Sequence, residues 1–196
     1  MSTSVMRRRI SEASPGFKAR IAGAVYLLYF ITAVAAESLI SRKRVSFGDA
    51  LNLIAYALYI VLTLLFYYLF KPVNRRLSLL AAVFGLLGCT VGVLEVFDLA
   101  PSRLSPLFFF GFYCLLIGYL TFRSTFLPRL LGSLMVLAGL GWLAFLVPVI
   151  AKTLSLYIEV LGIVAEASLM LWLLVKGVND QRWKEQASAT AAPIRA

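Results

Sequence analysis

Two glutamates, Glu159 and Glu166, lie within residues 154–176, an apolar stretch long enough to cross a lipid bilayer. Crossing about 30 Å of hydrocarbon takes about 20 helical residues. An acid at the centre of such a helix costs roughly 2.5–3.5 kcal/mol on insertion scales, so it usually faces protein or a cavity rather than lipid. The spacing of seven residues puts both acids on one helix face. We therefore look for the function of the protein on this face.

Other polar side chains lie at a similar predicted depth. Glu37 and Glu95 lie near the ends of two earlier apolar stretches, at the level of Glu159. Polar residues also recur at helical spacing in residues 51–70, namely Asn52, Tyr56, Tyr59, Thr63 and Tyr67. This stripe fits a packing seam between helices or a wall that faces a ligand. The candidate site is a cavity edged by Glu37, Glu95, Glu159 and Glu166 and walled by Tyr26, Tyr56 and Tyr59.

Three interpretations of Glu166 remain open from the sequence. In the first, the carboxyl is protonated because burial disfavours its charged form, and it hydrogen-bonds a neighbouring helix. In the second, it lines an outward-open cavity that attracts a cation, a proton or an amine-bearing ligand. The third is enzyme chemistry, but the chain has no histidine and no nucleophile or phosphate-binding motif. We assign no catalytic residue, no metal and no cofactor.

Six apolar helices are expected to position these residues. Of the 196 residues, 61% are hydrophobic, well above the 45–50% of soluble domains. The apolar runs predict membrane spans at residues 20–40, 51–70, 77–97, 107–122, 130–149 and 154–176. The predicted fold is an all-α bundle of six transmembrane helices within residues 19–178. A cytoplasmic basic arm, 1–18, precedes it, and a disordered cytoplasmic tail, 179–196, follows it.

The net charge of +10 is divided into short groups between the apolar runs. A nucleic-acid-binding protein would gather such charge on one face, so we exclude that class. Alternate connections carry 14 and 5 positive residues, which predicts that both termini are cytoplasmic in a bacterial inner membrane. Basic residues on that side are candidates for contact with anionic phospholipid headgroups, namely Arg7, Arg8, Arg9, Lys18, Arg20, Arg75, Arg76, Arg123 and Arg129.

The first helix allows two other interpretations. The arginines at residues 7–9 fit a twin-arginine export signal, although the apolar stretch begins more than ten residues later. The segment Ala33-Val34-Ala35 fits a signal-peptidase site behind a short apolar core. Cleavage or retention leaves residue 41 outside, so the topology of the later helices is the same in both cases.

Positive residues recur at intervals of 52 to 56 residues. Those that open outward-going helices are Arg20, Arg76 and Arg129, and those that close inward-going helices are Lys71, Arg123 and Lys176. The pattern fits three helical hairpins in parallel repeat, and it also follows from span length and the positive-inside rule alone. The two cysteines, Cys89 and Cys114, are expected to be buried packing residues rather than a disulfide.

Several stretches resemble a bacterial membrane-protein family known as domain of unknown function 4386. The resemblance is carried by residues 117–132 (IGYLTFRSTFLPRLLG), 137–141 (LAGLG), 19–23 (ARIAG) with Glu37, 72–75 (PVNR) and 166–179 (EASLMLWLLVKGVN). It covers about residues 19–183. It implies a six-helix integral membrane protein that keeps its first helix and that has acids at the positions of Glu37 and Glu166. Family members usually have a longer loop between the third and fourth helices.

The sequence thus predicts a membrane protein that binds or moves a small molecule or ion at an acidic cavity in its outer half. The rival class is a structural or accessory subunit of a larger membrane complex, in which the acids only hydrogen-bond. No activity accompanies the family resemblance. We expect the protein not to be an enzyme, and its partners to be lipids and either a small molecule or another membrane protein.

Overall fold

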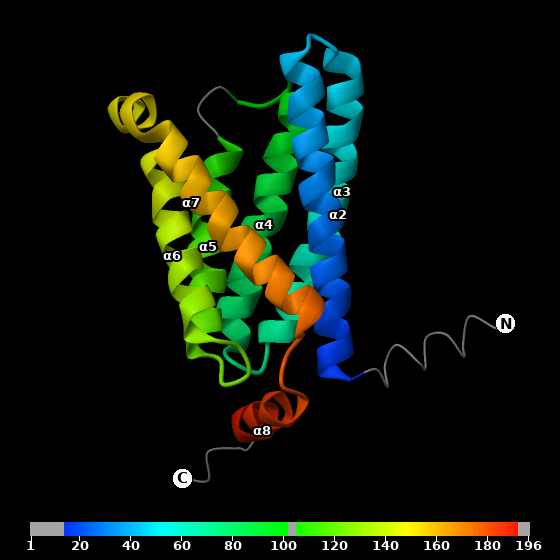
Figure 1. The fold of residues 1–196 in the computed structure, drawn as a ribbon, viewed down its shortest axis with the longest axis vertical. Helices are drawn as coiled ribbons and strands as arrows, with labels where there is room; N and C mark the ends of the chain where they lie inside the picture. The colour runs from blue at the N-terminus through cyan, green and yellow to red at the C-terminus, as the bar shows by residue number, and fades with distance from the viewer. Residues whose placement is uncertain (1–13, 102–104, 192–196) are drawn as a thin grey trace, which may run out of the picture.

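The computed structural model describes residues 14–101 and 105–191, and within these ranges the chain forms helices and turns without any strand. The helices are α2 (Pro15–Ser41), α3 (Val45–Phe70), α4 (Arg75–Val96), α5 (Pro106–Arg123), α6 (Arg129–Ala144), α7 (Pro148–Val175) and α8 (Asp180–Ala191) (Figure 1). Five of them, α2 to α5 and α7, are long and apolar enough to cross a membrane, and α6 is an apolar helix of 16 residues. The prediction of an all-helical, multi-pass membrane protein is confirmed.

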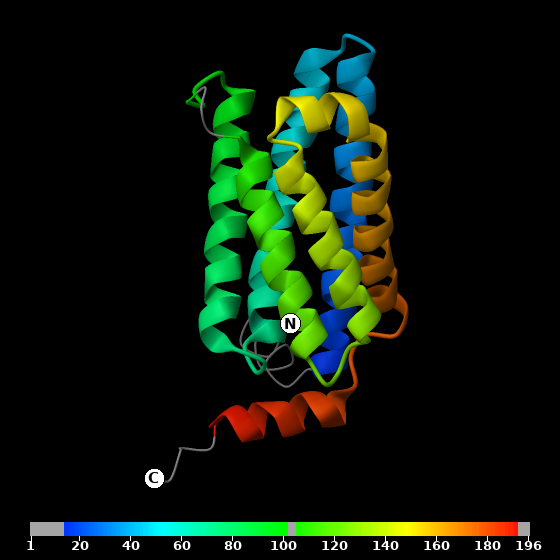
Figure 2. The same cartoon turned by 90° about the vertical axis from the view of Figure 1, so that its left-hand side faces the viewer.

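Helices α2 to α7 stand side by side in a closed circle. Each packs against the next one in sequence, and α7 returns to pack against α2. Successive helices run in opposite directions, and α8 lies across one end of the bundle (Figures 1 and 2). We call that end the α8 end and the opposite one the far end. Many large apolar side chains on the outside are exposed, as expected for helices that face lipid.

Capping residues mark where several helices begin. Asn74 accepts a hydrogen bond from the backbone N–H of Leu77 at the start of α4, and Ser105 accepts one from Leu107 at the start of α5. These side chains satisfy donors that have no partner inside the helix. Helices α2, α5 and α7 have proline in the first turn, where its missing N–H is tolerated. Local capping therefore places the starts of α4 and α5 within two residues of the predicted ones, whereas α2, α3 and α7 begin five or six residues earlier than predicted.

The backbones of α5 and α6 touch along a seam of four glycines, Gly111, Gly118, Gly132 and Gly139. A Cβ atom at Gly118 would lie 2.9 Å from the carbonyl oxygen of Gly132, and one at Gly139 would lie 2.8 Å from that of Gly111. Both distances are shorter than real Cβ atoms show, so only glycine fits here. We call this contact the glycine seam. Small residues of this kind let membrane helices approach closely and pack by van der Waals contact.

Helices α2 and α7 meet near the α8 end and then separate. A Cβ atom at Gly23 would lie 2.7 Å from the Cα of Leu174, so the two backbones are in contact there. Toward the far end α7 leans away from α2 (Figure 1). It is held instead by α6, because Trp142 packs on Gly162 and Gly141 packs on Ile158. The separation leaves space inside the circle, between α2 and α7, in the far half of the bundle.

The prediction of a disordered tail is wrong for residues 180–191, which form α8. Helix α7 ends at Val175, and two residues later Gly177 has a φ of +67°, a conformation that favours glycine. The next helix is capped by Asn179, which accepts a hydrogen bond from the N–H of Arg182 at 3.0 Å. The polar, alanine-rich sequence of this segment does not predict a membrane helix. It forms a short helix that makes hydrogen bonds to other parts of the chain.

Polar contacts hold α8 against three other parts of the α8 end. Trp183 Nε1 donates to the carbonyl of Leu69 at 2.9 Å, and Thr190 Oγ1 donates to that of Pro72 at 2.7 Å. The carboxylate of Asp180 accepts from the N–H of Gly16 at the start of α2. At the α5–α6 turn, Gln186 Oε1 accepts from the backbone N–H and the hydroxyl of Thr125. Helix α8 thus connects α2, the α3–α4 turn and the α5–α6 turn.

Candidate functional site

The site is centred on Glu166, which lies on the inner face of α7 and is only 5% exposed. The hydroxyl of Tyr26, from α2, donates a hydrogen bond to Glu166 Oε2 at 3.0 Å. Within the described ranges, no hydrogen bond reaches the other oxygen, Oε1. The carboxyl group therefore faces protein rather than lipid, as the insertion cost of a membrane acid predicts. Its Oε1 atom is available to accept a hydrogen bond from another group.

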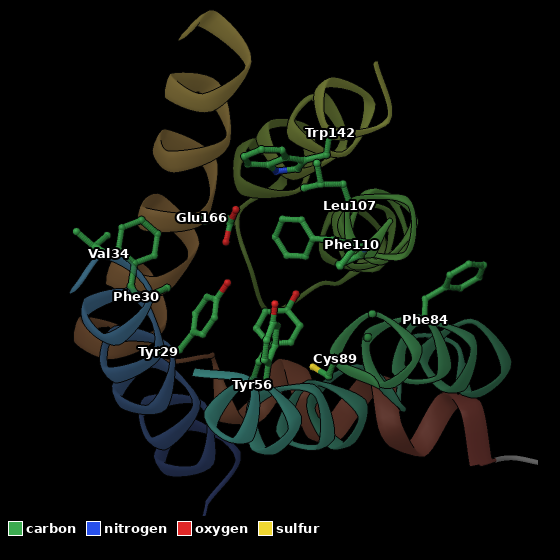
Figure 3. Close-up of a pocket in the computed structure, with 15 residues that line it drawn as sticks. Tyr29, Phe30, Val34, Tyr56, Phe84, Cys89, Leu107, Phe110, Trp142 and Glu166 are labelled. Carbon is green, nitrogen blue, oxygen red and sulfur yellow. The ribbon is translucent and has the colours of Figure 1, made fainter. Parts of the chain in front are cut away.

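Glu166 borders a cavity of about 300 Å³ to which all six helices of the circle contribute. Its wall is formed by Tyr29, Phe30, Ala33 and Val34 of α2, Tyr56 and Tyr59 of α3, Phe84, Gly85, Gly88 and Cys89 of α4, Pro106, Leu107 and Phe110 of α5, Trp142 of α6 and Glu166 of α7. Figure 3 shows the Glu166 carboxylate pointing to the centre of this space. Among the lining residues it is the only carboxylic acid.

Aromatic side chains form a continuous band around the carboxylate. The ring centroids of Tyr29 and Tyr59 are 4.9 Å apart, those of Tyr59 and Phe110 are 5.9 Å apart, and those of Phe110 and Trp142 are 5.7 Å apart. The hydroxyl of Tyr29 points toward Glu166 (Figure 3). Four of the six helices thus place aromatic rings around one acid, and these rings offer π faces and hydroxyl groups to whatever enters.

A second polar atom near the acid is the indole nitrogen of Trp142. Trp142 Nε1 is buried and makes no hydrogen bond in the described part of the chain. The edge of this indole lies against Gly162, which is one turn before Glu166 on α7. Gly162 therefore has two roles: it admits the indole, and it keeps a hydrogen-bond donor within one helical turn of the carboxylate.

Glycines of α4 shape the opposite side of the cavity. Gly85 and Gly88 line it, and Gly92 leaves room for the aromatic ring of Tyr56, which would collide with any Cβ atom there. These three glycines therefore allow close approach to the backbone of α4. The close approach serves to seat side chains from α3 and α5, because Gly85 also faces Thr63 and Tyr113 and Gly88 faces Phe109.

The structure brings together four of the seven predicted binding residues. Glu166, Tyr56 and Tyr59 line the cavity, and Tyr26 holds the carboxyl of Glu166. Glu37, Glu95 and Glu159 are exposed and are not among the lining residues. Glu159 shares the helical register of Glu166, but α7 has leaned away from α2 by that level, so the same face of the helix no longer borders the cavity (Figure 1).

Five aromatic lining residues, Tyr29, Phe30, Phe84, Phe110 and Trp142, were not predicted. Tyr29 follows Tyr26 by three residues, which is the spacing of neighbours on one helix face, so a signal for it exists in the sequence. Single aromatic residues such as Trp142 give no such signal, because a tryptophan near a helix end is also typical of the membrane interface.

Other predicted residues lie away from the cavity or beside it. Cys89 and Cys114 are free and buried, as expected, and Cys89 lines the cavity. The other basic candidates lie near helix ends at the α8 end: Lys18, Arg20, Arg75, Arg76 and Arg129 are within the first six residues of a helix, and Arg123 is the last residue of α5. Arg7, Arg8 and Arg9 lie outside the described ranges. In the described part of the chain, no group of three cysteine or acidic side chains is placed to hold a metal ion.

Comparison with known proteins gives one family and one curated relative. The model of the family described as "Domain of unknown function (DUF4386)" matches residues 41–102 and 95–177. An uncharacterized protein of the archaeon Archaeoglobus fulgidus is 27% identical over 118 residues, which cover 57% of this chain and 72% of the relative. No solved structure matches the chain.

The family matches include most of the cavity wall. Glu166, Tyr56, Tyr59 and Trp142 fall within them, whereas Tyr26 and Tyr29 of α2 precede residue 41. The two matches together span most of the chain, so the family assignment does not rest on one apolar helix. The protein belongs to the DUF4386 family of membrane proteins, whose function is unknown.

Proposed function

We propose that the protein binds or moves a small organic cation, an amine with an apolar body, in the aromatic cavity. The observation that carries this proposal is the position of Glu166, whose carboxylate points into a cavity of about 300 Å³ between aromatic rings. This volume is at the lower end of the range of small-molecule pockets, which run from about 300 to 1,000 Å³.

Electrostatics favours a cation over a neutral or anionic ligand. An ionised carboxylate loses most of its hydration on burial, and an opposite charge placed beside it offsets that loss. The faces of Tyr29, Tyr59, Phe110 and Trp142 add an attraction for cations, about 0.5–2 kcal/mol for each well-placed aromatic ring. The apolar remainder of the wall suits a hydrocarbon portion, so an alkyl or aryl amine fits better than a bare metal ion.

The hydrogen bond from Tyr26 prepares the acid for such a ligand. It fixes the carboxyl through Oε2, and no hydrogen bond in the described part of the chain occupies Oε1. A bound ammonium could then donate to Oε1, and the hydroxyls of Tyr29, Tyr56 and Tyr59 could accept its remaining N–H groups. Charge-assisted hydrogen bonds of this kind are roughly twice as strong as neutral ones.

We further propose that α6 is a sixth spanning helix and that both termini are cytoplasmic in a bacterial inner membrane. At 1.5 Å per residue, the 16 residues of α6 extend about 24 Å, a little less than the hydrocarbon thickness. The glycine seam supports this reading, because it holds α6 along α5. In this orientation the α8 end carries ten of the 14 positive residues that the structure describes, and the cavity lies in the outer half of the membrane.

An accessory role without a ligand remains the second candidate. The observation that favours it is the same hydrogen bond, because a protonated Glu166 bonded to Tyr26 would by itself connect α2 to α7. The two candidates differ in the charge that they require. Binding of a cation needs the carboxylate, whereas the connection between helices needs only an oxygen that accepts a hydrogen bond.

Glu166→Gln separates the two candidates, with Glu159→Gln as the matched control. Glutamine has almost the same shape and still accepts from Tyr26, but it carries no charge. The detergent-purified full chain is titrated with tetraethylammonium and a series of primary alkyl amines, and binding is followed by calorimetry and thermal shift. We expect Glu166→Gln to weaken binding at least tenfold, and we expect Glu159→Gln, on the exposed part of the same helix, to change it less than twofold.

Equal affinity of the wild type and the Glu166→Gln variant would rule out cation binding at this acid. Native mass spectrometry of protein extracted from its own membranes provides an independent check. An amine of matching mass that is lost in the variant supports the binding role, whereas a protein partner in fixed stoichiometry, kept by both forms, supports the accessory role.

A further inference from the structure

A groove at the α8 end combines three arginines from two distant parts of the chain. It lies between the α5–α6 turn and α8, and it is lined by Arg123, Ser124, Thr125, Leu127, Arg129, Arg182, Glu185, Gln186 and Ala189. Arg123 is the last residue of α5 and Arg129 is the first of α6, while Arg182 comes from the first turn of α8. The groove exists only because α8 docks on this turn.

Hydrogen bonds fix the floor of the groove and leave the guanidinium groups free to bind more. Arg182 Nη1 donates to the carbonyl of Thr125 at 3.3 Å, and Thr125 donates from its backbone N–H to Gln186 Oε1 at 3.1 Å. A guanidinium has five N–H donors in a planar fork that suits phosphate oxygens. Glu185 is the one acid among the lining residues, and it already accepts from Gln181 at 3.0 Å.

The surroundings of the groove distinguish a lipid from a free anion. Next to Arg123 and Arg129, toward the far end, Tyr119, Phe122, Leu130 and Leu137 are between 43% and 69% exposed on the outside of α5 and α6. The guanidinium of Arg129 lies 5.8 Å from the centre of the Phe122 aromatic ring. Positive charge and exposed apolar surface therefore meet at the ends of membrane helices. A molecule that uses both has an anionic head and hydrocarbon chains.

We propose that this groove binds the headgroup phosphate of an anionic glycerophospholipid, with Arg123, Arg129 and Arg182 as its ligands. The acyl chains lie along the exposed apolar surface of α5 and α6. Helix α8, which lies across the end of the bundle (Figure 2), supplies the third arginine. This site is independent of the aromatic cavity, because the two share no lining residue.

Arg182→Gln tests the proposal, with Lys184→Gln as the matched control. Both positions are exposed and belong to α8, and both variants lose one positive charge, but only Arg182 lines the groove. The full chain is purified in detergent, mixed with phosphatidylglycerol or phosphatidylcholine, and examined by native mass spectrometry. We expect Arg182→Gln to reduce retained phosphatidylglycerol about tenfold, Lys184→Gln to reduce it less than twofold, and phosphatidylcholine to bind weakly to all forms.

Two further measurements keep the result interpretable. Circular dichroism and thermal unfolding of each variant establish that α8 is still formed, and Arg182→Lys, which keeps the charge but lacks the fork, should give an intermediate loss. If Arg182→Gln and Lys184→Gln reduce retained phosphatidylglycerol equally, the lipid is attracted by the general positive charge of the surface and not by the groove, and the proposal is overturned. Displacement of phosphatidylglycerol by millimolar inorganic phosphate would also overturn it, since the groove would then be a site for the free anion.

Discussion

Helices α5 and α6 are in close contact along the glycine seam, whereas α2 and α7, which are similarly apolar, separate where they border the cavity. At the glycine seam the two backbones stay in contact over two helical turns, from Gly118 beside Gly132 to Gly139 beside Gly111. Between α2 and α7 a comparable contact occurs at Gly23, and beyond it the helices separate. The four glycines of the seam thus keep α5 and α6 together along their length. The contact at Gly23 holds α2 and α7 together at one point only, which we call the pivot, and leaves space for a ligand beyond it.

The largest effect should follow a change in the glycine seam. Gly132→Ala would place a Cβ atom 2.5 Å from the backbone nitrogen of Phe122 and 2.7 Å from the carbonyl oxygen of Gly118. Because backbone cannot move aside as a flexible side chain does, we expect a loss of about 1–3 kcal/mol in the free energy of unfolding, measured by denaturation in detergent.

Gly141→Ala is the control on the same helix. Its Cβ atom would meet a side-chain carbon of Ile158 at 3.1 Å, which a small shift of that side chain relieves. We expect little change in stability from this variant. If the two substitutions destabilise the protein equally, close backbone contact is not what makes the seam different.

A smaller effect is expected at the pivot. Gly23→Ala would put a Cβ atom 2.7 Å from Leu174 Cα and separate α2 from α7 near the α8 end. Since the helices already diverge beyond this point, α2 can tilt, and we expect about half the loss seen for Gly132→Ala. The same tilt would draw Tyr26 away from Glu166, so amine binding should weaken as well. Unchanged binding in a destabilised Gly23→Ala variant would contradict the pivot.

The smallest effect concerns the hydrogen bond itself. Tyr26→Phe removes the donor to Glu166 and leaves the aromatic ring, which packs on Phe66 with centroids 5.9 Å apart. Hydrogen bonds between membrane helices are worth about 0.6 kcal/mol on average, so thermal unfolding should shift only slightly. A double-mutant cycle with Glu166→Gln gives the coupling energy of the pair, and a coupling near zero would show that the bond contributes nothing.

Most of the fold follows from patterns that lie within single helices. Apolar run length, prolines in turns and capping residues are local, and they predicted α4 and α5 to within two residues at each end. Helices α2, α3 and α7 begin five or six residues before the predicted spans. The shortening of α6 to end at Ala144, rather than near residue 149, depends on a turn before Pro148. That turn lies in an apolar segment, and no charged residue marks it in the sequence.

The site was only partly predictable because its position depends on how helices tilt. Glu166 and the two α3 tyrosines could be recognised, because the sequence itself shows an acid within an apolar stretch and polar residues at helical spacing. The exposure of Glu159 results from the lean of α7, and the contribution of Trp142 depends on Gly162 across an interface. Neither can be read from residue spacing within one helix.

Helix α8 follows α2 to α7 in the chain, so it leaves the ribosome after them. Its bonds to Gly16, Leu69, Pro72 and Thr125 join segments that were synthesised well before it. The other helices can therefore enter the membrane one after another while these turns are still free of one another. Docking of α8 then fixes α2 and the turns at the α8 end relative to one another after the helices that they connect have been made.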